Sequence, residues 1–160
     1  MEILLHLATL VLFAVLAILS WIDLKSFRLP DIFTLPLIAA GLGVGWLLNT
    51  PLLSITGAII GYGFFYALEV FYLRFRGLEA LGRGDAKLLA AGGAWCGALL
   101  IPILLLIATG SALLYLFILG VIRREMPTAM TRIALGPWLA FGFALCWIYR
   151  AYGPGPYPAI

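Results

Sequence analysis

The sequence predicts an all-α protein that crosses a membrane with about six helices. Apolar residues make up 64% of the 160 residues and charged residues only 11%, and the mean hydropathy is +1.13. An average soluble protein has about 45–50% apolar and about 25% charged residues. A chain of this length cannot hide so much apolar surface from water, so we expect lipid around most of it. The apolar stretches do not alternate with polar residues as barrel strands do, which favours helices.

The charged residues divide the chain into four long uncharged windows. These windows cover residues 3–22, 32–68, 88–122 and 133–149. A bilayer core about 30 Å thick needs roughly 20 apolar residues of helix. The first and last windows therefore predict one helix each, and the two longer windows predict a helical hairpin each.

Turn-forming residues place the bends of the two hairpins. Asn49-Thr50-Pro51 predicts the first turn, and the glycine- and proline-containing segment 97–102 predicts the second. The fourth helix, expected at about residues 85–100, is short. The tail 153–160 is too rich in Pro and Gly for a helix. We therefore predict a six-helix domain over residues 1–152, followed by this tail.

Lysine and arginine set the expected orientation. With six helices, the connections after the first, third and fifth helices lie on one side of the membrane. They hold all the basic residues except Arg150, namely Lys25, Arg28, Arg74, Arg76, Arg83, Lys87, Arg123, Arg124 and Arg132. The positive-inside rule places these connections in the cytoplasm and both termini outside. Such connections suit an anionic lipid surface, and nothing in their pattern indicates nucleic-acid binding.

Few polar residues are available for chemistry. The sequence contains neither HExxH nor GxSxG, and Cys96 and Cys146 form neither a CxxC pair nor zinc-ligand spacing. We expect both cysteines to be small buried side chains, and a disulfide between the fourth and sixth helices stays open. The single histidine, His6, is 17 residues before Asp23, about 25 Å along one helix, so we place it at the outer membrane face. The sequence implies no metal ion and no cofactor.

Two aspartates are the strongest candidates for catalysis. Asp23 lies at the end of the first predicted helix and Asp85 at the start of the fourth. Because these helices run in opposite directions, we expect both carboxyls at the same membrane depth. Neighbouring carboxyls share a proton, so one can activate water while the other polarises a carbonyl group. The structural alternative is that Asp23 marks a helix end and Asp85 stabilises a helix N-terminus.

The residues around Asp85 resemble a known catalytic motif. Gly82 and Gly84 precede Asp85 and permit a close backbone approach, which resembles the GxGD motif of intramembrane aspartyl proteases. With Glu79 and Lys87, the longer pattern Glu-x-x-Gly-x-Gly-Asp-x-Lys resembles the bacterial type IV prepilin peptidases. Three further segments resemble parts of that family in the same order: residues 23–36, 91–97 and 135–139.

The resemblance implies a membrane-embedded aspartic endopeptidase of the bacterial inner membrane. Asp23 and Asp85 would be its catalytic pair at the cytoplasmic boundary. The substrates would be prepilins or pseudopilins of a type IV pilus or a type II secretion system, each with a short basic leader that ends in Gly and is followed by a hydrophobic helix. No cofactor is implied, and the sequence does not set the oligomeric state.

Each residue near the two aspartates has one or more expected roles. Gly82 and Gly84 would shape the active-site loop. Lys87 would tune Asp85, contact the substrate or face lipid head groups. Glu79 would pair with the basic leader or lie in solvent, and Asp31 would cap the second helix.

One departure and several alternatives remain. Many prepilin peptidases carry two CxxC pairs in an N-terminal segment linked to N-methylation, and this sequence lacks those cysteines, so it supports the peptidase and not the methyltransferase. The chain is either a naturally short peptidase or part of a longer protein. A related GxGD protease acting on archaellins is the nearest alternative. Outside the proteases, the alternatives are a small transporter or channel with Asp23 and Asp85 as an ion site, and a non-catalytic partner in pilus or secretion assembly.

Overall fold

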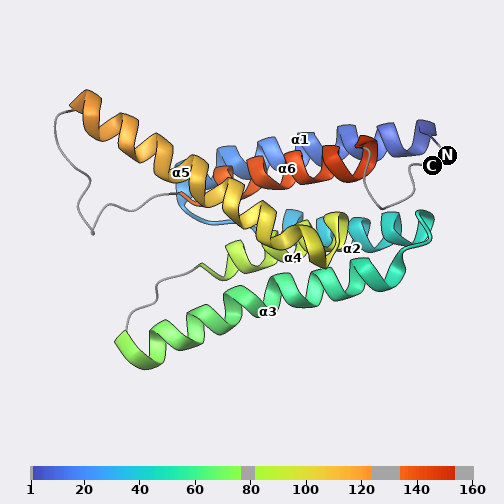
Figure 1. Cartoon of the computed structure of the whole chain (residues 1–160), viewed down its shortest axis with the longest axis horizontal. Helices are drawn as coiled ribbons and strands as arrows, with labels where there is room; N and C mark the ends of the chain where they lie inside the picture. Colours follow the sequence, from blue (N-terminus) through green and yellow to red (C-terminus); the bar gives the residue numbers. More distant parts are fainter. Residues whose placement is uncertain (1, 77–81, 124–133, 154–160) are drawn as a thin grey trace.

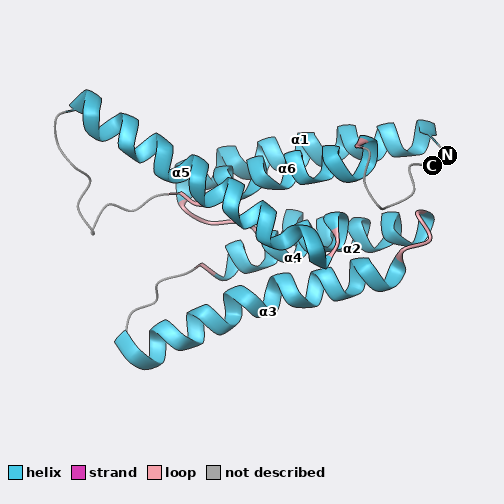
Figure 2. Ribbon diagram, viewed as in Figure 1, coloured by secondary structure: helices cyan, strands magenta, loops and turns pink. Residues whose placement is uncertain are grey.

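A computed structural model describes residues 2–76, 82–123 and 134–153 of the chain (Figures 1 and 2). This part of the chain folds into six α-helices, with one short 3-10 turn, η1. The helices are α1 (Glu2–Ser26), α2 (Asp31–Leu47), α3 (Pro51–Arg76), α4 (Arg83–Cys96), α5 (Ile101–Arg123) and α6 (Gly136–Tyr152), and η1 is Ala98–Leu100. The predicted all-α fold is therefore confirmed, and both hairpin turns lie where the sequence placed them. The tail beyond Gly153 lies outside the described residues.

Within the described residues, three helical segments are long and apolar enough to cross a membrane. They are Glu2–Ser26, Pro51–Phe75 and Ala98–Ile122, with mean hydropathies of 2.6, 1.5 and 2.4. The helix α2 is apolar but has only 17 residues. The helix α4 has 14 residues, which at 1.5 Å per residue is about 21 Å. Of the six helices predicted to span, three therefore meet the length and composition of a membrane span.

The short helix α4 lies at the centre of the bundle. It packs against α2, α3, α5 and α6, and every residue from Leu88 to Cys96 is buried. Alanine and glycine dominate this stretch, so the neighbouring helices can approach closely. In Figure 1, α1 and α6 run side by side above α4 and α3 runs below it, while α2, which also packs against α4, lies at about the same level. A helix enclosed on several sides holds the residues of its first turn, including Asp85, in a fixed place.

Glycines bring α3 and α4 into backbone contact. A Cβ added at Gly57 would collide with the carbonyl group of Gly93, and a Cβ added at Gly93 would collide with that of Gly57. One turn further along, a Cβ at Gly61 would lie 2.5 Å from the carbonyl oxygen of Leu89. Glycines at positions 57, 61 and 93 therefore allow the backbones of α3 and α4 to lie in direct contact.

Arg150 holds the other end of α4. From the sequence, Arg150 was only the one basic residue on the outer side of the membrane. In the structure, Arg150 is buried and 6% exposed. Its Nη1 donates a hydrogen bond to the carbonyl oxygen of Trp95 at 2.7 Å, and its Nη2 donates to Thr50 Oγ1 at 2.6 Å. A cation at the carbonyl end of a helix is stabilised by the helix dipole. Arg150 is thus a buried structural residue of α6.

The two cysteines are buried, as predicted, and His6 lies far from the aspartates. Cys96 and Cys146 are both buried and neither forms a disulfide. His6 lies at the opposite end of α1 from Asp23, where its Nδ1 is 2.7 Å from Tyr152 Oη. The described ends of the chain therefore meet at one end of the bundle (Figure 1), and the candidate aspartates lie at the other.

Candidate active site

Asp23 lies in the last turn of α1 and is 5% exposed. Its backbone carbonyl accepts a hydrogen bond from the N–H of Phe27 at 2.9 Å, and Phe27, with φ of +51°, turns the chain out of the helix. The Asp23 side chain points to the start of α6, where its Oδ2 accepts a hydrogen bond from the N–H of Gly136 at 2.8 Å. The last turn of α1 and the first residue of α6 together fix this carboxyl group.

Asp85 lies in the first turn of α4. The helix starts after Gly82, whose carbonyl oxygen accepts a hydrogen bond from the N–H of Asp85 at 3.0 Å. Gly84 lies directly against the linker between α1 and α2, because a Cβ added there would be 2.8 Å from the Cβ of Leu29. A Cβ at Gly82 would meet Oδ2 of Asp85 at 3.4 Å, which is an ordinary contact. Of the two motif glycines, Gly84 is therefore the one required by packing.

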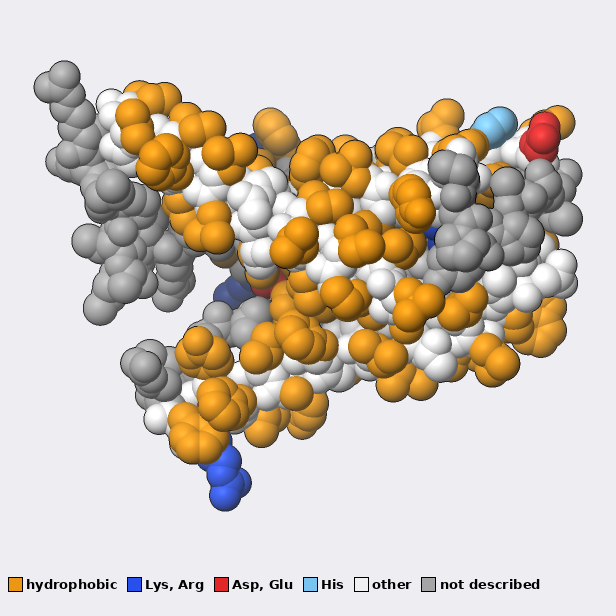
Figure 3. Space-filling view, in the orientation of Figure 1, with side chains coloured by type: hydrophobic (Ala, Val, Ile, Leu, Met, Phe, Trp, Pro, Cys, Tyr) orange, Lys and Arg blue, Asp and Glu red, His pale blue; other side chains and the backbone are white. Residues whose placement is uncertain are grey.

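Asp23 and Asp85 line the same cavity, which has a volume of about 300 Å³. Its other walls come from the linker between α1 and α2, the start of α2 and the first turn of α4: Phe27, Arg28, Leu29, Asp31, Gly82, Arg83, Gly84 and Lys87. Figure 3 shows acidic and basic atoms in a hollow between the projecting ends of α3 and α5, while the flanks of the bundle are hydrophobic. The opposed directions of α1 and α4 bring the two aspartates together, as the sequence predicted.

The surroundings of Asp85 favour its protonated form. Asp85 lies outside the three helical segments that meet the requirements of a membrane span. Burial raises the pKa of its carboxyl group to about 7, and the charge of Asp23 contributes to the rise. Two carboxyls of this kind titrate as a pair and share one proton over a range of pH. A pair that holds one proton has both an acid and a base available.

Lys87 forms an ion pair beside the aspartates. Its Nζ lies 2.6 Å from Asp31 Oδ1, which links α4 to the first turn of α2. The prediction that Asp31 caps α2 is wrong, because Pro30 occupies the N-cap position and no side chain caps the helix. Arg83 similarly lies 3.4 Å from Glu69 Oε1 on α3. Glu79 lies outside the described residues.

Gly136 is the site residue that the sequence analysis did not assign. Segment 135–139 was singled out only for its family resemblance, and no local pattern reveals a contact to a residue 113 positions away. A Cβ at Gly136 would lie 2.6 Å from Asp23 Oδ2, so only glycine leaves room for the carboxylate. The sequence feature that points to this position is the Gly136-Pro137 pair, because proline is frequent in the first turn of a helix and so marks the start of α6.

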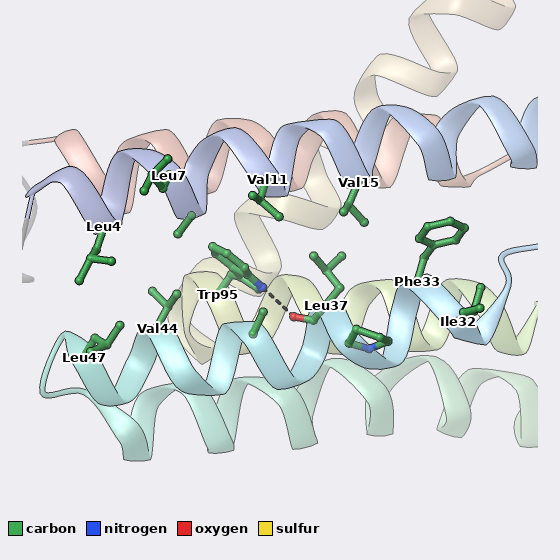
Figure 4. Close-up of a pocket in the computed structure, with 13 residues that line it drawn as sticks. Leu4, Leu7, Val11, Val15, Ile32, Phe33, Leu37, Val44, Leu47 and Trp95 are labelled. Carbon is green, nitrogen blue, oxygen red and sulfur yellow. Dashed lines mark hydrogen bonds between the residues drawn. The ribbon is translucent and has the colours of Figure 1, made fainter.

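A larger cavity between α1 and α2 has a different character. Its volume is about 470 Å³, and its lining residues carry no titratable group. Figure 4 shows apolar side chains of the two helices facing this space, and Trp95, whose Nε1 donates a hydrogen bond to the carbonyl oxygen of Leu37 at 2.8 Å. Acid–base chemistry therefore belongs to the aspartate cavity. Among the described residues, no cluster of three His, Cys, Asp or Glu side chains is placed to hold a metal ion.

Several known proteins have similar sequences. The family model of the type IV leader peptidase family matches residues 10–118. A prepilin leader peptidase/N-methyltransferase of Escherichia coli K12 is 38% identical over 136 residues, which are 84% of this chain and 59% of that protein. Its counterpart from Pectobacterium carotovorum is 41% identical over 137 residues, 83% of this chain and 48% of that protein.

A shorter relative matches over almost its whole length. The leader peptidase HopD of Escherichia coli is 37% identical over 142 residues, which are 86% of this chain and 91% of that protein. By contrast, the chain spans about half the length of the bifunctional relatives. No solved structure matches the chain. The family match, the identity to these relatives and the paired aspartates lead to one conclusion: the chain belongs to the type IV leader peptidase family.

Proposed function

We propose that this chain is an aspartic endopeptidase that removes leader peptides from type IV prepilins or pseudopilins, with Asp23 and Asp85 as the catalytic pair. One observation carries the proposal: the two aspartates, 62 residues apart in the sequence, line one cavity in a chain of the leader peptidase family. The names of the bifunctional relatives include an N-methyltransferase. The proposal concerns the peptidase alone.

The pair can hydrolyse a peptide bond without any other reacting group. One aspartate, ionised, takes a proton from water as the water oxygen attacks the scissile carbonyl carbon. The other, protonated, gives its proton to the carbonyl oxygen, which produces a tetrahedral gem-diol. The first aspartate then protonates the amide nitrogen, the C–N bond breaks, and one hydroxyl returns a proton to the second aspartate. The leader leaves as a carboxylic acid, the mature protein has a new amino terminus, and both aspartates regain their starting state.

The placement of the site suits a substrate that is partly in the membrane. The aspartates lie at one end of a bundle whose flanks are apolar (Figure 3), and the basic residues Arg28, Arg83 and Lys87 lie at the same end. By the positive-inside rule, this end faces the cytoplasm of the bacterial inner membrane. A substrate would place its hydrophobic helix in the membrane and its basic leader in the cytoplasm, so that the scissile bond lies at the boundary. The peptidase domain would comprise residues 1–152.

The direct test is cleavage of a defined substrate. The full chain, purified in lipid nanodiscs, is incubated with each prepilin and pseudopilin encoded in the same genome, and the products are identified by mass spectrometry. We expect at least one substrate to be cut once, at the junction of leader and hydrophobic helix. A prepilin without its leader is the matched control and should stay intact. If the folded protein cleaves none of these substrates, the proposed function is wrong.

A further inference from the structure

The two aspartates have unequal hydrogen-bond partners. Oδ2 of Asp23 accepts a hydrogen bond from the N–H of Gly136 at 2.8 Å. Among residues 2–76, 82–123 and 134–153, none donates a hydrogen bond to the carboxyl group of Asp85. A fixed N–H donor stabilises a carboxylate and disfavours its protonated form. This asymmetry favours a negative charge on Asp23.

The helix ends act in the opposite direction but more weakly. Asp23 lies in the last turn of α1 and Asp85 in the first turn of α4, so the dipoles of their own helices favour a negative charge on Asp85. A hydrogen bond to a charged group typically contributes roughly three times the free energy of an exposed helix-end dipole. The bond from Gly136 also comes from the first residue of α6, so the dipole of α6 adds to its effect on Asp23.

We propose that Gly136 is a positioning residue whose N–H keeps the negative charge of the pair on Asp23, so that Asp23 is the general base and Asp85 the general acid. This assignment rests on the proposed function. Asp23 then takes the proton from the attacking water, and Asp85 gives its proton to the scissile carbonyl oxygen. Asp23 passes its proton to the leaving nitrogen, and the gem-diol returns one to Asp85. The raised pKa of Asp85 agrees with this division.

The other charged groups near the pair do not account for a negative charge on Asp23, so the N–H of Gly136 is the contact that does. On α2 and α4, Asp31 and Lys87 pair with each other, and on α3 and α4, Glu69 pairs with Arg83. On α1, Lys25 lies over the ring of Trp21 at 4.5 Å. The linker contributes Arg28, which is exposed and has no hydrogen bond to Asp23. At this end, the described part of α6 contributes no charged side chain.

Glycine is required at position 136, and a matched control lies on the same helix. In Gly136→Ala, the new Cβ would lie 2.6 Å from Asp23 Oδ2 and 2.9 Å from Asp23 Cγ, so the carboxylate must leave the N–H. In Gly142→Ala, the new Cβ would lie 2.6 Å from the carbonyl oxygen of Leu104 on α5 and touch neither aspartate. The two variants crowd α6 similarly, but only Gly136→Ala disturbs the pair.

The first experiment is the pH dependence of kcat/KM for prepilin cleavage by the full chain in nanodiscs. We expect Gly136→Ala to move the acidic limb, which reports ionisation of the base, upward by about one to two pH units, the loss expected for one hydrogen bond to a charged group. Gly142→Ala should keep the limb where it is. Equal shifts in both variants, or a shift in neither while both retain activity, would overturn the assignment and leave the proposed function standing.

The second experiment needs no glycine variant to fold. The chain contains only three aspartates, Asp23, Asp31 and Asp85, so carboxyl-¹³C aspartate gives three NMR signals that Asp→Asn variants assign. At pH 6 we expect the Asp23 signal to be that of a carboxylate and the Asp85 signal that of a protonated acid. The reverse pattern, with Asp85 charged and Asp23 protonated, would refute the assignment. If both Asp23→Asn and Asp85→Asn still cleave the prepilin, the proposed function is refuted instead.

Discussion

Gly84→Ala tests how closely the linker between α1 and α2 must approach the start of α4. The added Cβ would lie 2.8 Å from the Cβ of Leu29, and ordinary contacts begin at 3.4 Å, so Leu29 or the first turn of α4 must recede by about 0.6 Å. Leu29 is buried and lies in the short linker that joins the helix of Asp23 to α2. Overpacking of this kind costs about 1–3 kcal/mol of the free energy of unfolding. Because Asp85 follows Gly84 directly, the displacement also acts on the proposed catalytic pair.

The expected loss of activity is larger than the loss of stability. A misplacement of about 1 Å can lower a reaction rate about 100-fold, so a shift of about 0.6 Å predicts a fall of about tenfold or more in kcat/KM for prepilin cleavage. The assay pairs cleavage kinetics in nanodiscs with the thermal unfolding midpoint of the same sample. Gly63→Ala is the control, since a Cβ there has no neighbour within 4 Å. Wild-type cleavage by Gly84→Ala would show that the close approach at Leu29 does not position the pair.

Four further predictions concern the pKa of Asp85 and two contacts of the bundle. Because the pKa of Asp85 is raised to about 7, kcat/KM should fall as the pH rises above about 7 and the acid loses its proton; a pH profile flat to pH 9 would contradict this. The same raised pKa means that the folded state binds this proton more tightly than the unfolded chain, so its contribution to stability is fully present below about pH 4 and is lost as the pH rises through about 7. The side chains of the ion pair Lys87–Asp31 are 23% and 56% exposed. A double-mutant cycle with Lys87→Met and Asp31→Asn should therefore give a coupling free energy below about 1 kcal/mol. A much larger coupling would mean that the pair is effectively buried. Gly93→Val would force apart the backbones of α3 and α4 and should lower the free energy of unfolding by about 3 kcal/mol. Denaturant titration in detergent measures this loss, with Gly63→Ala as the control variant.

The order of the helices and the meeting of Asp23 and Asp85 at one cavity were predictable because both depend on local or topological signals. Charged residues bound the apolar windows, and Asn49-Thr50-Pro51 marks a turn that the structure has, with Asn49 at φ of +54°. Antiparallel helices bring a residue at the end of α1 to the level of one at the start of α4. These inferences need only chain direction and spacing, and no knowledge of how helices rotate against each other.

The contacts that hold the aspartates depend on helix rotation and could not be predicted. Asp31 was expected to cap α2, but the rotation of α4 presents Lys87 to it, 56 residues away. Arg150 was counted only for its side of the membrane, yet it is buried against the end of α4. The Gly136 N–H that binds Asp23 is a backbone group, so no side-chain pattern marks it.

The cleavage rates of Asp23→Asn and Asp85→Asn test whether the two aspartates together hydrolyse the leader peptide bond, as we propose. Each substitution preserves the shape of the side chain and removes one ionisable carboxyl group from the cavity that both residues line. We predict that either variant loses cleavage of a prepilin that the wild type cuts, while its unfolding midpoint stays close to or above that of the wild type. Cleavage at the wild-type rate by either folded variant would show that the two aspartates are not the catalytic pair.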